Sequence, residues 1–384
     1  MLRILLILLL LISIPDCYIW WMYLRDTPSP WRLALLLLPT LGALSCMALF
    51  LCRVEVPGLL QITFALLLCI AVPKLTFVLA DLLGRGAVAL HLGPQRWATG
   101  CAMALALIMA SAQLYGTLWG WRRLQVCSTE LKVDGLPKGF EGYRIVQISD
   151  LHLGSYAGHT DFVAQMVDSV NRQQPDLIVF TGDLVNTTAE EAAPFVETLS
   201  RLRAKDGVLA ILGNHDYMTY ASVHAPRERA ERFRQLLRME GEMGWEVLQN
   251  RHRTLLRGGD TLYVAGVENI SKPPFPSYGN LDKALADIPQ HGCTLLLSHD
   301  PGHWRRDIVG RHPQVALMLS GHTHALQLQI GGFSPASWMM PEWGGLYREG
   351  HQQLYVSTGI GGSIPYRLGA WPQIEVLTLR GFNR

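Results

Sequence analysis

The chain has 384 residues, enough for two or three domains, and with 49% hydrophobic and only 17% charged residues it is apolar for a soluble protein. Residues 1–125 carry nine Lys and Arg against four Asp and Glu, whereas the remainder carries 24 against 27. This slightly acidic remainder gives no reason to expect nucleic acid as a partner. The seven cysteines form no CxxC pair and no disulfide framework, which is typical of a reducing compartment.

The first third of the chain holds long apolar runs. Four of them reach the ~20 residues that a bilayer requires: residues 2–24, Trp31–Leu51, Leu59–Leu83 and Trp97–Trp119. The first run could also be a signal peptide, but no small-residue cleavage site follows it. Tyr18, Trp20 and Trp21 instead resemble an interfacial aromatic belt. We therefore expect an all-α transmembrane bundle of about four helices over residues 1–124.

The orientation of this bundle follows only weakly from charge. Four spans place both chain ends on one side, and the basic residues of the loops divide four against four. The pair Arg122-Arg123 after the last span favours a cytoplasmic second half. Asp16 and Lys74 lie within or near the spans, and charges inside a bilayer are functional candidates by default. The alternative is that both lie near span ends or pair with each other.

Residues 125–142 are predicted as a linker with a strand at Glu130–Val133, and residues 143–384 as one α/β domain. The domain begins with alternating strands and helices, at Tyr143–Ser149, Thr160–Arg172, Leu177–Thr181, Ala189–Arg203 and Val208–Leu212. This alternation predicts parallel strands with crossover helices.

The rest of the domain is predicted to hold one long helix, Arg227–Met239, and mostly strands. The predicted strands are Gly244–Leu248, Thr261–Gly266, Leu281–Ala286, Thr294–Ser298, Ala316–Ser320, Gln353–Ser357 and Glu375–Leu379. Because long helices do not separate them, we expect a mixed or doubled sheet.

One stretch of this domain points to a metal site. The apolar run Leu177–Phe180 predicts a buried strand, which ends at Gly182, and Asp183 follows directly. A carboxylate at the mouth of a buried strand is costly unless something compensates its charge. A divalent metal would do so, and Asp183 is our candidate for a carboxylate that bridges two ions.

Four other stretches supply matching ligands, each after an apolar run: Asp150-Leu-His152, Gly213-Asn-His-Asp216, His299 and Gly321-His-Thr-His324. Carboxylate and imidazole together suit Mn, Fe or Zn. A single histidine of this kind is more often a hydrogen-bonded core residue, but five such motifs at successive strand ends are hard to obtain independently. The chain has no Gly-x-x-x-x-Gly-Lys loop and no Gly-x-Ser-x-Gly elbow.

This series of motifs resembles the calcineurin-like metallophosphoesterase superfamily over about residues 143–380, and with the spans it is most similar to the membrane-associated bacterial branch. The resemblance implies a four-layer α/β/β/α sandwich with two divalent metal ions, Mn, Fe or Zn. Carried over by position, one metal is held by Asp150, His152, Asp183 and His324. The other is held by Asp183, Asn214, His299 and His322.

The resemblance also implies a reaction. A hydroxide that bridges the metals attacks the phosphorus, and His215 contacts the scissile phosphate as a catalytic donor. Asp216 is a second predicted catalytic residue, and Asn214, His215 and Arg367 are predicted substrate contacts. For Arg367 the alternative is a surface ion pair.

We therefore expect a membrane-bound phosphoesterase in the bacterial inner membrane, with a cytoplasmic catalytic domain. Its substrate is expected to be a phosphodiester or pyrophosphate of a lipid-type amphiphile. The membrane tether and two aromatic and proline-rich loops, Lys272–Tyr278 and Phe333–Trp343, motivate this. The second loop carries Trp338, Met339, Met340 and Trp343; the alternative is that these residues pack under the loop. The other candidates are a tethered nucleotide phosphodiesterase, a tethered phosphoprotein phosphatase and a non-catalytic membrane sensor. The oligomeric state is not predicted.

The sequence departs from the family pattern at two places. Asn186 stands where many members have an aspartate that orients the catalytic histidine, so we expect Asn186 to orient His215 without adding charge. Ala325-Leu326 stand where many relatives have two glycines, which predicts a narrower or more apolar pocket wall.

Overall fold

The computed structural model describes residues 2–26, 29–52, 58–220 and 225–382. The chain divides into two compact units, Met1–Trp119 and Gly120–Arg384, and each unit is described by itself.

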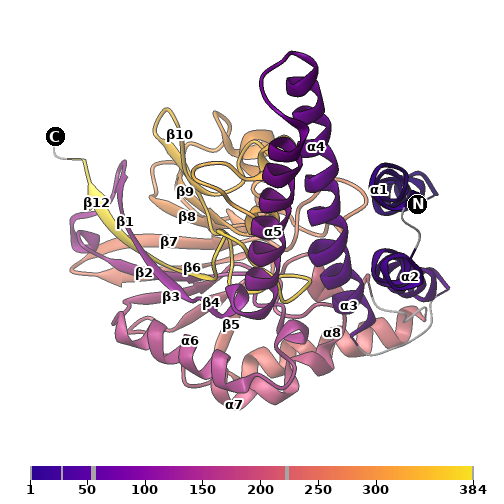
Figure 1. Ribbon diagram of the computed structural model, residues 1–384. Helices are drawn as coiled ribbons and strands as arrows, with labels where there is room; N and C mark the ends of the chain where they lie inside the picture. The colour runs from indigo at the N-terminus through magenta and orange to yellow at the C-terminus, as the bar shows by residue number, and fades with distance from the viewer. Residues whose placement is uncertain (1, 27–28, 53–57, 221–224, 383–384) are drawn as a thin grey trace. The chain divides into compact units, whose positions relative to one another are not determined.

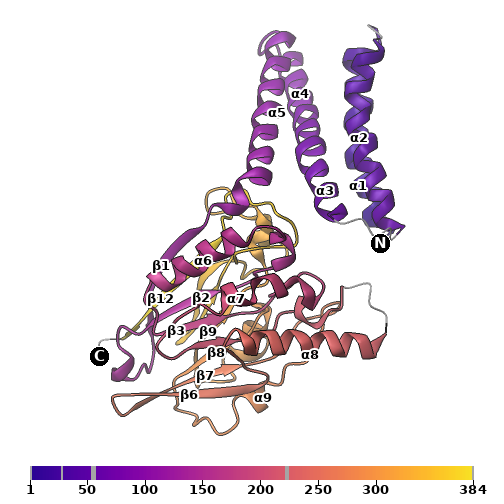
Figure 2. The same cartoon turned by 90° about the horizontal axis from the view of Figure 1, so that it is seen from below.

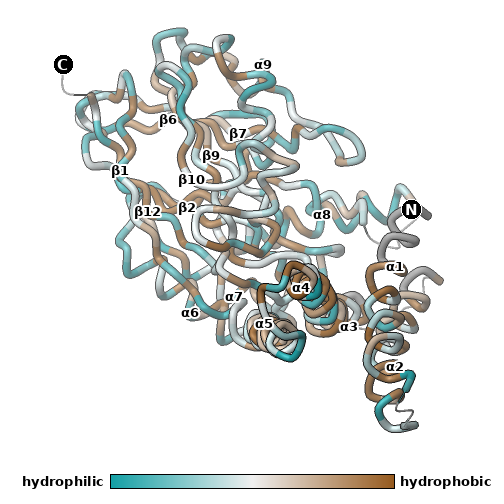
Figure 3. The backbone as a smooth tube through the Cα atoms, turned by 45° about the horizontal axis from the view of Figure 1, so that its top comes forward, coloured by the Kyte–Doolittle hydropathy of each residue, from teal (hydrophilic) through white to brown (hydrophobic). Residues whose placement is uncertain are grey.

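The first unit is all-helical. Its elements are α1 (Leu2–Ile19) with a π-helical turn at Trp20–Leu24, α2 (Pro30–Leu51), α3 (Leu59–Leu66), a second π-helical turn at Leu67–Ala71, α4 (Val72–Ala89) and α5 (Gln95–Leu118). Helices α4 and α5 lie side by side (Figures 1 and 2). Hydrophobic residues run along the helices, as the brown tube in Figure 3 shows.

Within the described residues, three helices are long and apolar enough to cross a membrane: Pro30–Leu49, Gln61–Ala89 and Gln95–Leu118. Three of the four predicted spans thus have the required length, and the apolar helix at Leu9–Leu24 is shorter. These helices indicate a multi-pass membrane protein.

Two buried acids of the first unit each form an ion pair with a cation. Lys74 Nζ lies 2.7 Å from Asp16 Oδ1, so the alternative in which these two residues pair with each other is the one observed. Asp81, which no motif in the sequence marks, accepts hydrogen bonds from Tyr18 Oη at 2.6 Å and Arg85 Nε at 2.9 Å. The partner of Asp16 is Lys74 and that of Asp81 is Arg85, so neither buried carboxylate is left without a positive charge beside it.

The second unit contains two six-stranded mixed sheets. The first has the order β1-β12-β2-β3-β4-β5, with β1 Gln125–Val133, β12 Gln373–Gly381, β2 Arg144–Ile148, β3 Leu177–Phe180, β4 Val208–Ala210 and β5 Trp245–Val247. The second has the order β10-β11-β9-β8-β7-β6, with β10 Gly345–Glu349, β11 Gln352–Val356, β9 Val315–Ser320, β8 Thr294–Leu297, β7 Asp260–Gly266 and β6 Arg251–Arg257. Strands β2 to β5 are mutually parallel, and so are β7, β8, β9 and β11.

Among the described residues, three apolar cores hold these layers together. Between the sheets, residues such as Val179 of β3 and Leu295 of β8 are fully buried. The outer face of the first sheet is covered by α6 (Thr160–Arg172), α7 (Val196–Leu199) and α8 (Pro226–Glu242). The outer face of the second sheet is covered by α9 (Leu281–Ala284) and a π-helical turn at Trp304–Ile308. The central strands are apolar on both faces because both faces are buried, and this is the predicted α/β sandwich.

Two parts of the predicted organisation differ from the structure. The stretch 125–142, expected to be a linker, begins with β1, which pairs in parallel with β12 along its whole length. Leu281–Ala286, expected to be a strand, forms α9 instead. The side chain of Asn280 caps this helix by accepting from Lys283 N at 2.9 Å, and this local bond outweighs the apolar run.

Other predicted elements are present with changed bounds. The helix expected at Ala189–Arg203 is broken into two 3-10 turns and α7, with Pro194 inside the second turn. Two strands at sheet edges, β6 and β10, were not predicted. Strand β6 is mostly charged or polar, and β10 ends in Arg348 and Glu349, since an edge strand is paired on one side only.

Candidate metal centre

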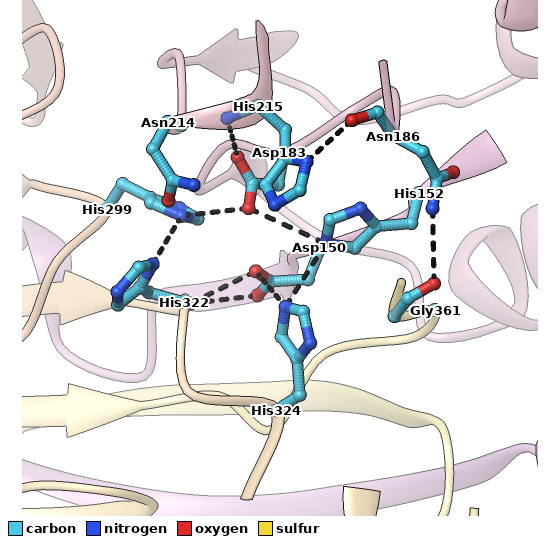
Figure 4. A network of polar contacts seen from close by, with 12 residues as sticks. Asp150, His152, Asp183, Asn186, Asn214, His215, His299, His322, His324 and Gly361 are labelled. Atoms are coloured by element: carbon cyan, nitrogen blue, oxygen red, sulfur yellow. Dashed lines mark hydrogen bonds and ion pairs between the residues drawn. The ribbon is translucent and has the colours of Figure 1, made fainter. Parts of the chain in front are cut away.

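The five motifs come directly after the strands that the two sheets hold at their centres. Asp150 follows β2, Asp183 follows β3 and Asn214 follows β4, whereas His299 and His322 follow β8 and β9. Parallel strands end at the same edge of a sheet. The structure therefore gathers side chains from five separate loops at one place (Figure 4).

The backbone at these loops takes a conformation that side chains usually avoid. Five of the predicted ligands have positive φ angles: Asp150 (52°), His152 (47°), Asp183 (61°), His322 (74°) and His324 (49°). Such residues cost about 1–3 kcal/mol each and cluster at functional sites. The sheets behind the loops stabilise this strained geometry.

Two glycines of the motifs permit the close approach of the loops. A Cβ on Gly213 would lie 2.2 Å from Asp183 Oδ1, and a Cβ on Gly321 would lie 2.0 Å from Ser149 Oγ. Any larger residue at either position would push the carboxylate loops apart.

The first group of ligands comprises Asp150, His152, Asp183 and His324, whose ligand atoms all lie within 4.8 Å of one another. His324 Nε2 is 2.9 Å from Asp150 Oδ1, and His152 Nε2 is 3.5 Å from Asp183 Oδ2. The Nε2 atoms of the two histidines are 3.2 Å apart. The four candidate metal-ligand atoms thus converge on one small volume.

The second group comprises Asp183, His299 and His322. His299 Nε2 lies 3.2 Å from Asp183 Oδ2 and 3.3 Å from His322 Nδ1. Asn214 completes this group. Its Nδ2 donates to Tyr220 Oη at 3.0 Å, while its buried Oδ1 has no partner among the described residues. Asp183 belongs to both groups, which is the arrangement that a bridging carboxylate needs.

The electrostatics of the cluster fit a cation. Burial lowers the pKa of His152 well below its usual range, and burial lowers that of His322 to about 4, so both imidazoles are neutral at pH 7. Burial opposes ionisation of Asp150, but His324 brings the pKa of this carboxyl down to about 2. Burial lowers the pKa of His299, but Asp183 raises it to about 10, so this imidazole releases a proton when it binds a metal. Imidazoles, carboxylates and one amide oxygen form a ligand set suited to Mn, Fe or Zn. The residues present therefore fit two divalent ions.

His215 lies beside both groups with its orientation fixed. Its backbone N–H donates to Asp183 Oδ1 at 2.9 Å, and its Nδ1 lies 2.6 Å from the carbonyl oxygen of Asn186. The ring also packs edge-on against His152, with 4.7 Å between centroids. With Nδ1–H donating to a carbonyl, Nε2 is the nitrogen left for a substrate.

The prediction that the Asn186 side chain orients His215 is wrong, because the backbone carbonyl does so. The Asn186 side chain points to another loop: its Oδ1 accepts from Ser155 N at 3.2 Å and its Nδ2 donates to Ser155 Oγ at 3.1 Å. A backbone carbonyl is present whatever the side chain at position 186 is, so His215 keeps its hydrogen-bond partner even though the aspartate is missing.

Asp216, predicted to be catalytic, is completely buried beneath the site. Its carboxylate accepts the backbone N–H groups of Asp183 at 2.9 Å, Leu184 at 2.8 Å and Gly213 at 2.8 Å. It thereby ties together the loops after β3 and β4 and does not reach the reacting atoms. It is a positioning residue.

Arg367, predicted to contact substrate, is also a structural residue. It is 1% exposed, and its guanidinium donates to the carbonyls of Ala370 and Thr358, both at 2.8 Å, and of Gly361. Its Nε has no hydrogen-bond partner among the described residues, but these bonds hold both terminal nitrogens of a buried side chain inside the 358–371 loop, so we do not retain it as a substrate contact. The surface ion pair considered as its alternative is not observed either.

The two residues that replace glycines lie next to the centre. Ala325 and Leu326 have φ angles of 51° and 46°, a region that glycine adopts freely and other residues at a cost of roughly 1–2 kcal/mol each. Ala325 is buried, while 45% of Leu326 is exposed. The sequence therefore places an apolar, strained pair where the backbone would favour glycine.

A cavity of about 340 Å³ adjoins the second ligand group. It brings together the two loops singled out from the sequence, through Lys272 and Phe275 of one and Met339 and Met340 of the other. The ring of Phe275 stands edge-on to His322, 5.1 Å between centroids. Arg306 and Asp300 also line it, and sequence reasoning missed both, although Asp300 directly follows the predicted ligand His299.

The fold and this centre define a class, the hydrolases that hold two metal ions in an α/β sandwich. The sequence matches the calcineurin-like phosphoesterase family over residues 143–326. It is 32% identical to the "Transmembrane protein with metallophosphoesterase domain" of Danio rerio, over 72% of this chain and 62% of that protein. It is 30% identical to "Uncharacterized metallophosphoesterase YkuE" of Bacillus subtilis, over 72% of this chain and 94% of that protein. The chain therefore belongs to the calcineurin-like metallophosphoesterases.

The chain spans less than two thirds of the length of the Danio rerio protein. Among solved structures, TT1561 of Thermus thermophilus is 17% identical, with a TM-score of 0.36 over 57% of this chain and 90% of that chain.

Proposed function

We propose that this metallophosphoesterase hydrolyses a phosphodiester or pyrophosphate bond of an amphiphilic, lipid-type substrate in a bacterial inner membrane, with its catalytic unit in the cytoplasm. The observation that carries the proposal is the cavity beside His322. Its wall combines apolar side chains, Phe275 and Met339, with two cations, Lys272 and Arg306, and two acids, Asp300 and Glu342. An acyl-bearing phosphate ester can place its chain on the apolar side chains and its negative charge on the cations.

The chemistry divides between the metal ligands and His215. Asp150, His152, Asp183 and His324 would hold one divalent ion, and Asp183, Asn214, His299 and His322 would hold the other. Such ions would supply Lewis-acid polarisation of the phosphoryl oxygens and would lower the pKa of water at the site. His215 Nε2 donates a proton to a phosphoryl or leaving-group oxygen, while Nδ1–H is held on the Asn186 carbonyl. Asp216 accepts hydrogen bonds from the backbone N–H groups of Asp183 and Gly213, and it thereby holds the loop of His215 against the loop of Asp183.

The exposed surface around the cavity also supports an amphiphile. Trp338 is 78% exposed and Met339 is 73% exposed, and the ring of Phe333 stacks at a tilt on Trp338 with 5.5 Å between centroids. The alternative prediction, that these residues pack under their loop, does not describe Trp338 and Met339. Apolar side chains gathered at a surface suit an acyl chain or a bilayer.

The test compares one ester with and without its acyl chains. The full chain in detergent, loaded with Mn²⁺, is given a lipid phosphodiester and the soluble headgroup ester derived from it. We expect a lower KM for the lipid, and we expect Met339→Asp to remove this difference while leaving turnover of the soluble ester unchanged. Arg348→Asp, on β10 and outside the cavity, is the control.

Equal turnover of the two esters by the unaltered protein would contradict the lipid assignment. Faster turnover of a nucleotide diester or a phosphopeptide than of the lipid would assign the site to one of the other two enzyme classes. No hydrolysis of any ester with both metals bound would favour the membrane sensor.

A further inference from the structure

A second cavity lies among the membrane helices, in the first unit. It has a volume of about 600 Å³, within the ~300–1,000 Å³ range of small-molecule sites. Its wall is formed by α1 with its π-helical turn and by α2, and the side chains that matter here are Asp16, Trp20, Leu33 and Leu37. Apart from Asp16 this wall is almost wholly apolar.

Asp16 forms an ion pair with Lys74, and within the part of the chain that the structure describes only one of its two carboxylate oxygens has a hydrogen-bond partner. Lys74 Nζ donates to Asp16 Oδ1 at 2.7 Å, to the Leu36 carbonyl at 2.7 Å and to Thr40 Oγ1 at 2.8 Å. These three bonds use all three ammonium protons. Asp16 is 4% exposed, yet its Oδ2 has no hydrogen-bond partner among the described residues. A buried carboxylate oxygen without a donor is costly, and because Asp16 lines the cavity, a hydrogen-bond donor bound there would remove that cost.

The position of Asp16 along its helix indicates the kind of ligand. Trp20 and Trp21 follow it by about one helical turn, and the guanidinium of Arg25 stacks on the Trp21 ring at 4.4 Å. Trp and Arg gather where a membrane meets water. The carboxylate thus lies roughly 5–8 Å inside that boundary, given the 1.5 Å rise per residue. Lipid glycerol and linkage groups lie at such a depth.

We propose that this cavity binds a membrane lipid with a free hydrogen-bond donor, a hydroxyl or primary amine, at the head of its acyl chains. The donor bonds Asp16 Oδ2, and a chain lies along Trp20, Leu33 and Leu37. Because the Asp16–Lys74 pair is neutral as a whole and presents an acceptor, a lipid that has only phosphate and quaternary ammonium at its head is disfavoured. The site is separate from the metal centre and does not depend on the proposed function.

The test measures lipid retained by the full chain in detergent. Diacylglycerol supplies a hydroxyl, phosphatidylethanolamine an amine and phosphatidylcholine no donor. We expect at least tenfold more retention of one or both donor lipids than of phosphatidylcholine, and the two donor arms identify which group is bound. Equal retention of all three would overturn the proposal.

Two substitutions locate the site. Leu33→Trp fills the cavity without touching the ion pair and should lower donor-lipid retention at least tenfold. Leu35→Trp on the same helix, at a 67% exposed leucine outside the cavity wall, should leave it unchanged. Equal losses in both variants would contradict the assignment.

Asp16→Asn tests the polar contact. The amide oxygen can still accept from Lys74, but an N–H₂ donor then replaces the free acceptor, so the preference over phosphatidylcholine should disappear. A preference that survives in a folded Asp16→Asn protein would overturn the role of Asp16. If this variant does not fold, the leucine pair decides the question.

Discussion

The two units of this protein bury charge in different ways. In the membrane helices the buried carboxylates each have a cation, Lys74 for Asp16 and Arg85 for Asp81. In the catalytic unit Asp150 and Asp183 are buried together among histidines, with no Lys or Arg paired to them among the described ion pairs. Pairing within the chain balances the charge of the first arrangement, whereas the second needs an external cation. Buried carboxylates are thus neutralised by the chain itself in one unit and require a bound cation in the other.

The largest effect is expected at the residue that both ligand groups share. Asp183→Ala removes one ligand from each group, so activity should fall by more than ~10⁴-fold, beyond a single general-acid effect. Bound metal, measured by elemental analysis, should fall with it. Full metal occupancy in this variant would show that Asp183 does not bridge.

His215→Ala should separate catalysis from metal binding. The backbone N–H that donates to Asp183 remains in alanine, so metal content should stay unchanged, while activity should fall by ~10²–10⁴-fold because a proton donor is lost. If the variant empties the centre, His215 is a ligand and its assignment here is wrong.

Lys74→Met should destabilise the membrane unit by removing the cation that is paired with Asp16. It leaves Asp16 buried without a cation, which costs about 3–5 kcal/mol, and thermal unfolding in detergent should reveal it. Arg25→Ala is the control, since the pair Arg25–Asp26 is exposed and worth roughly 0–1 kcal/mol. Equal destabilisation in the two variants would contradict the comparison.

Glu375 is a buried acid of the catalytic unit outside the metal centre, and it predicts a pH dependence. Burial raises its pKa to about 7, although Tyr355 Oη donates to it at 2.8 Å. The folded state therefore binds this proton more tightly than the unfolded state. Its contribution to the free energy of unfolding should be complete below pH ~4.3 and be lost as pH rises to about 7, by at most about 1.4 kcal/mol per pH unit.

Glu375→Gln removes the titrating carboxyl group, so the free energy of unfolding should depend less on pH as pH rises to about 7. Denaturant unfolding at pH 5 and pH 8 measures it, and the variant should gain stability relative to the unaltered protein at pH 8. An unchanged difference between the two pH values would count against a protonated Glu375.

The smallest effect is expected for Asn186→Asp. Because the side chain contacts Ser155 and the backbone carbonyl holds His215, activity should stay within about threefold and the pH–rate profile should keep its shape. An upward shift of the pH optimum, with metal content unchanged, would show that a carboxylate at this position reaches His215 and favours its protonated form.

Much of the fold was predictable from the sequence because the buried strands are short, mostly apolar runs. Leu177–Phe180 and Thr294–Leu297 are apolar on both faces, and polar ligands follow each of them directly. That pattern predicted which residues would meet. It carries no information on edge strands such as Arg251–Arg257, which are mostly charged or polar, or on α9, whose start depends on the cap that Asn280 forms.

The side-chain roles were harder to predict than the side-chain positions. Asp216 and Asn186 stand in the motifs, but spacing alone does not reveal that one faces backbone N–H groups and the other faces Ser155. Arg367 looked exposed in a Pro-Tyr-Arg turn, whereas backbone carbonyls surround it. Such roles depend on which loop lies opposite, and this is a tertiary property.

The pairing of β1 with β12 determines how the catalytic unit can be isolated. A fragment that starts at Tyr143, where the family match begins, would lack β1 and leave the backbone N–H and C=O groups of Gln373–Gly381 open along one side. Open strand edges recruit other chains and aggregate. A fragment that starts at Gly120 retains this edge strand and the buried Trp121, which packs with Tyr156 and Phe162 at 5.6 and 6.2 Å between centroids. Expression trials and crystallisation should therefore begin upstream of β1.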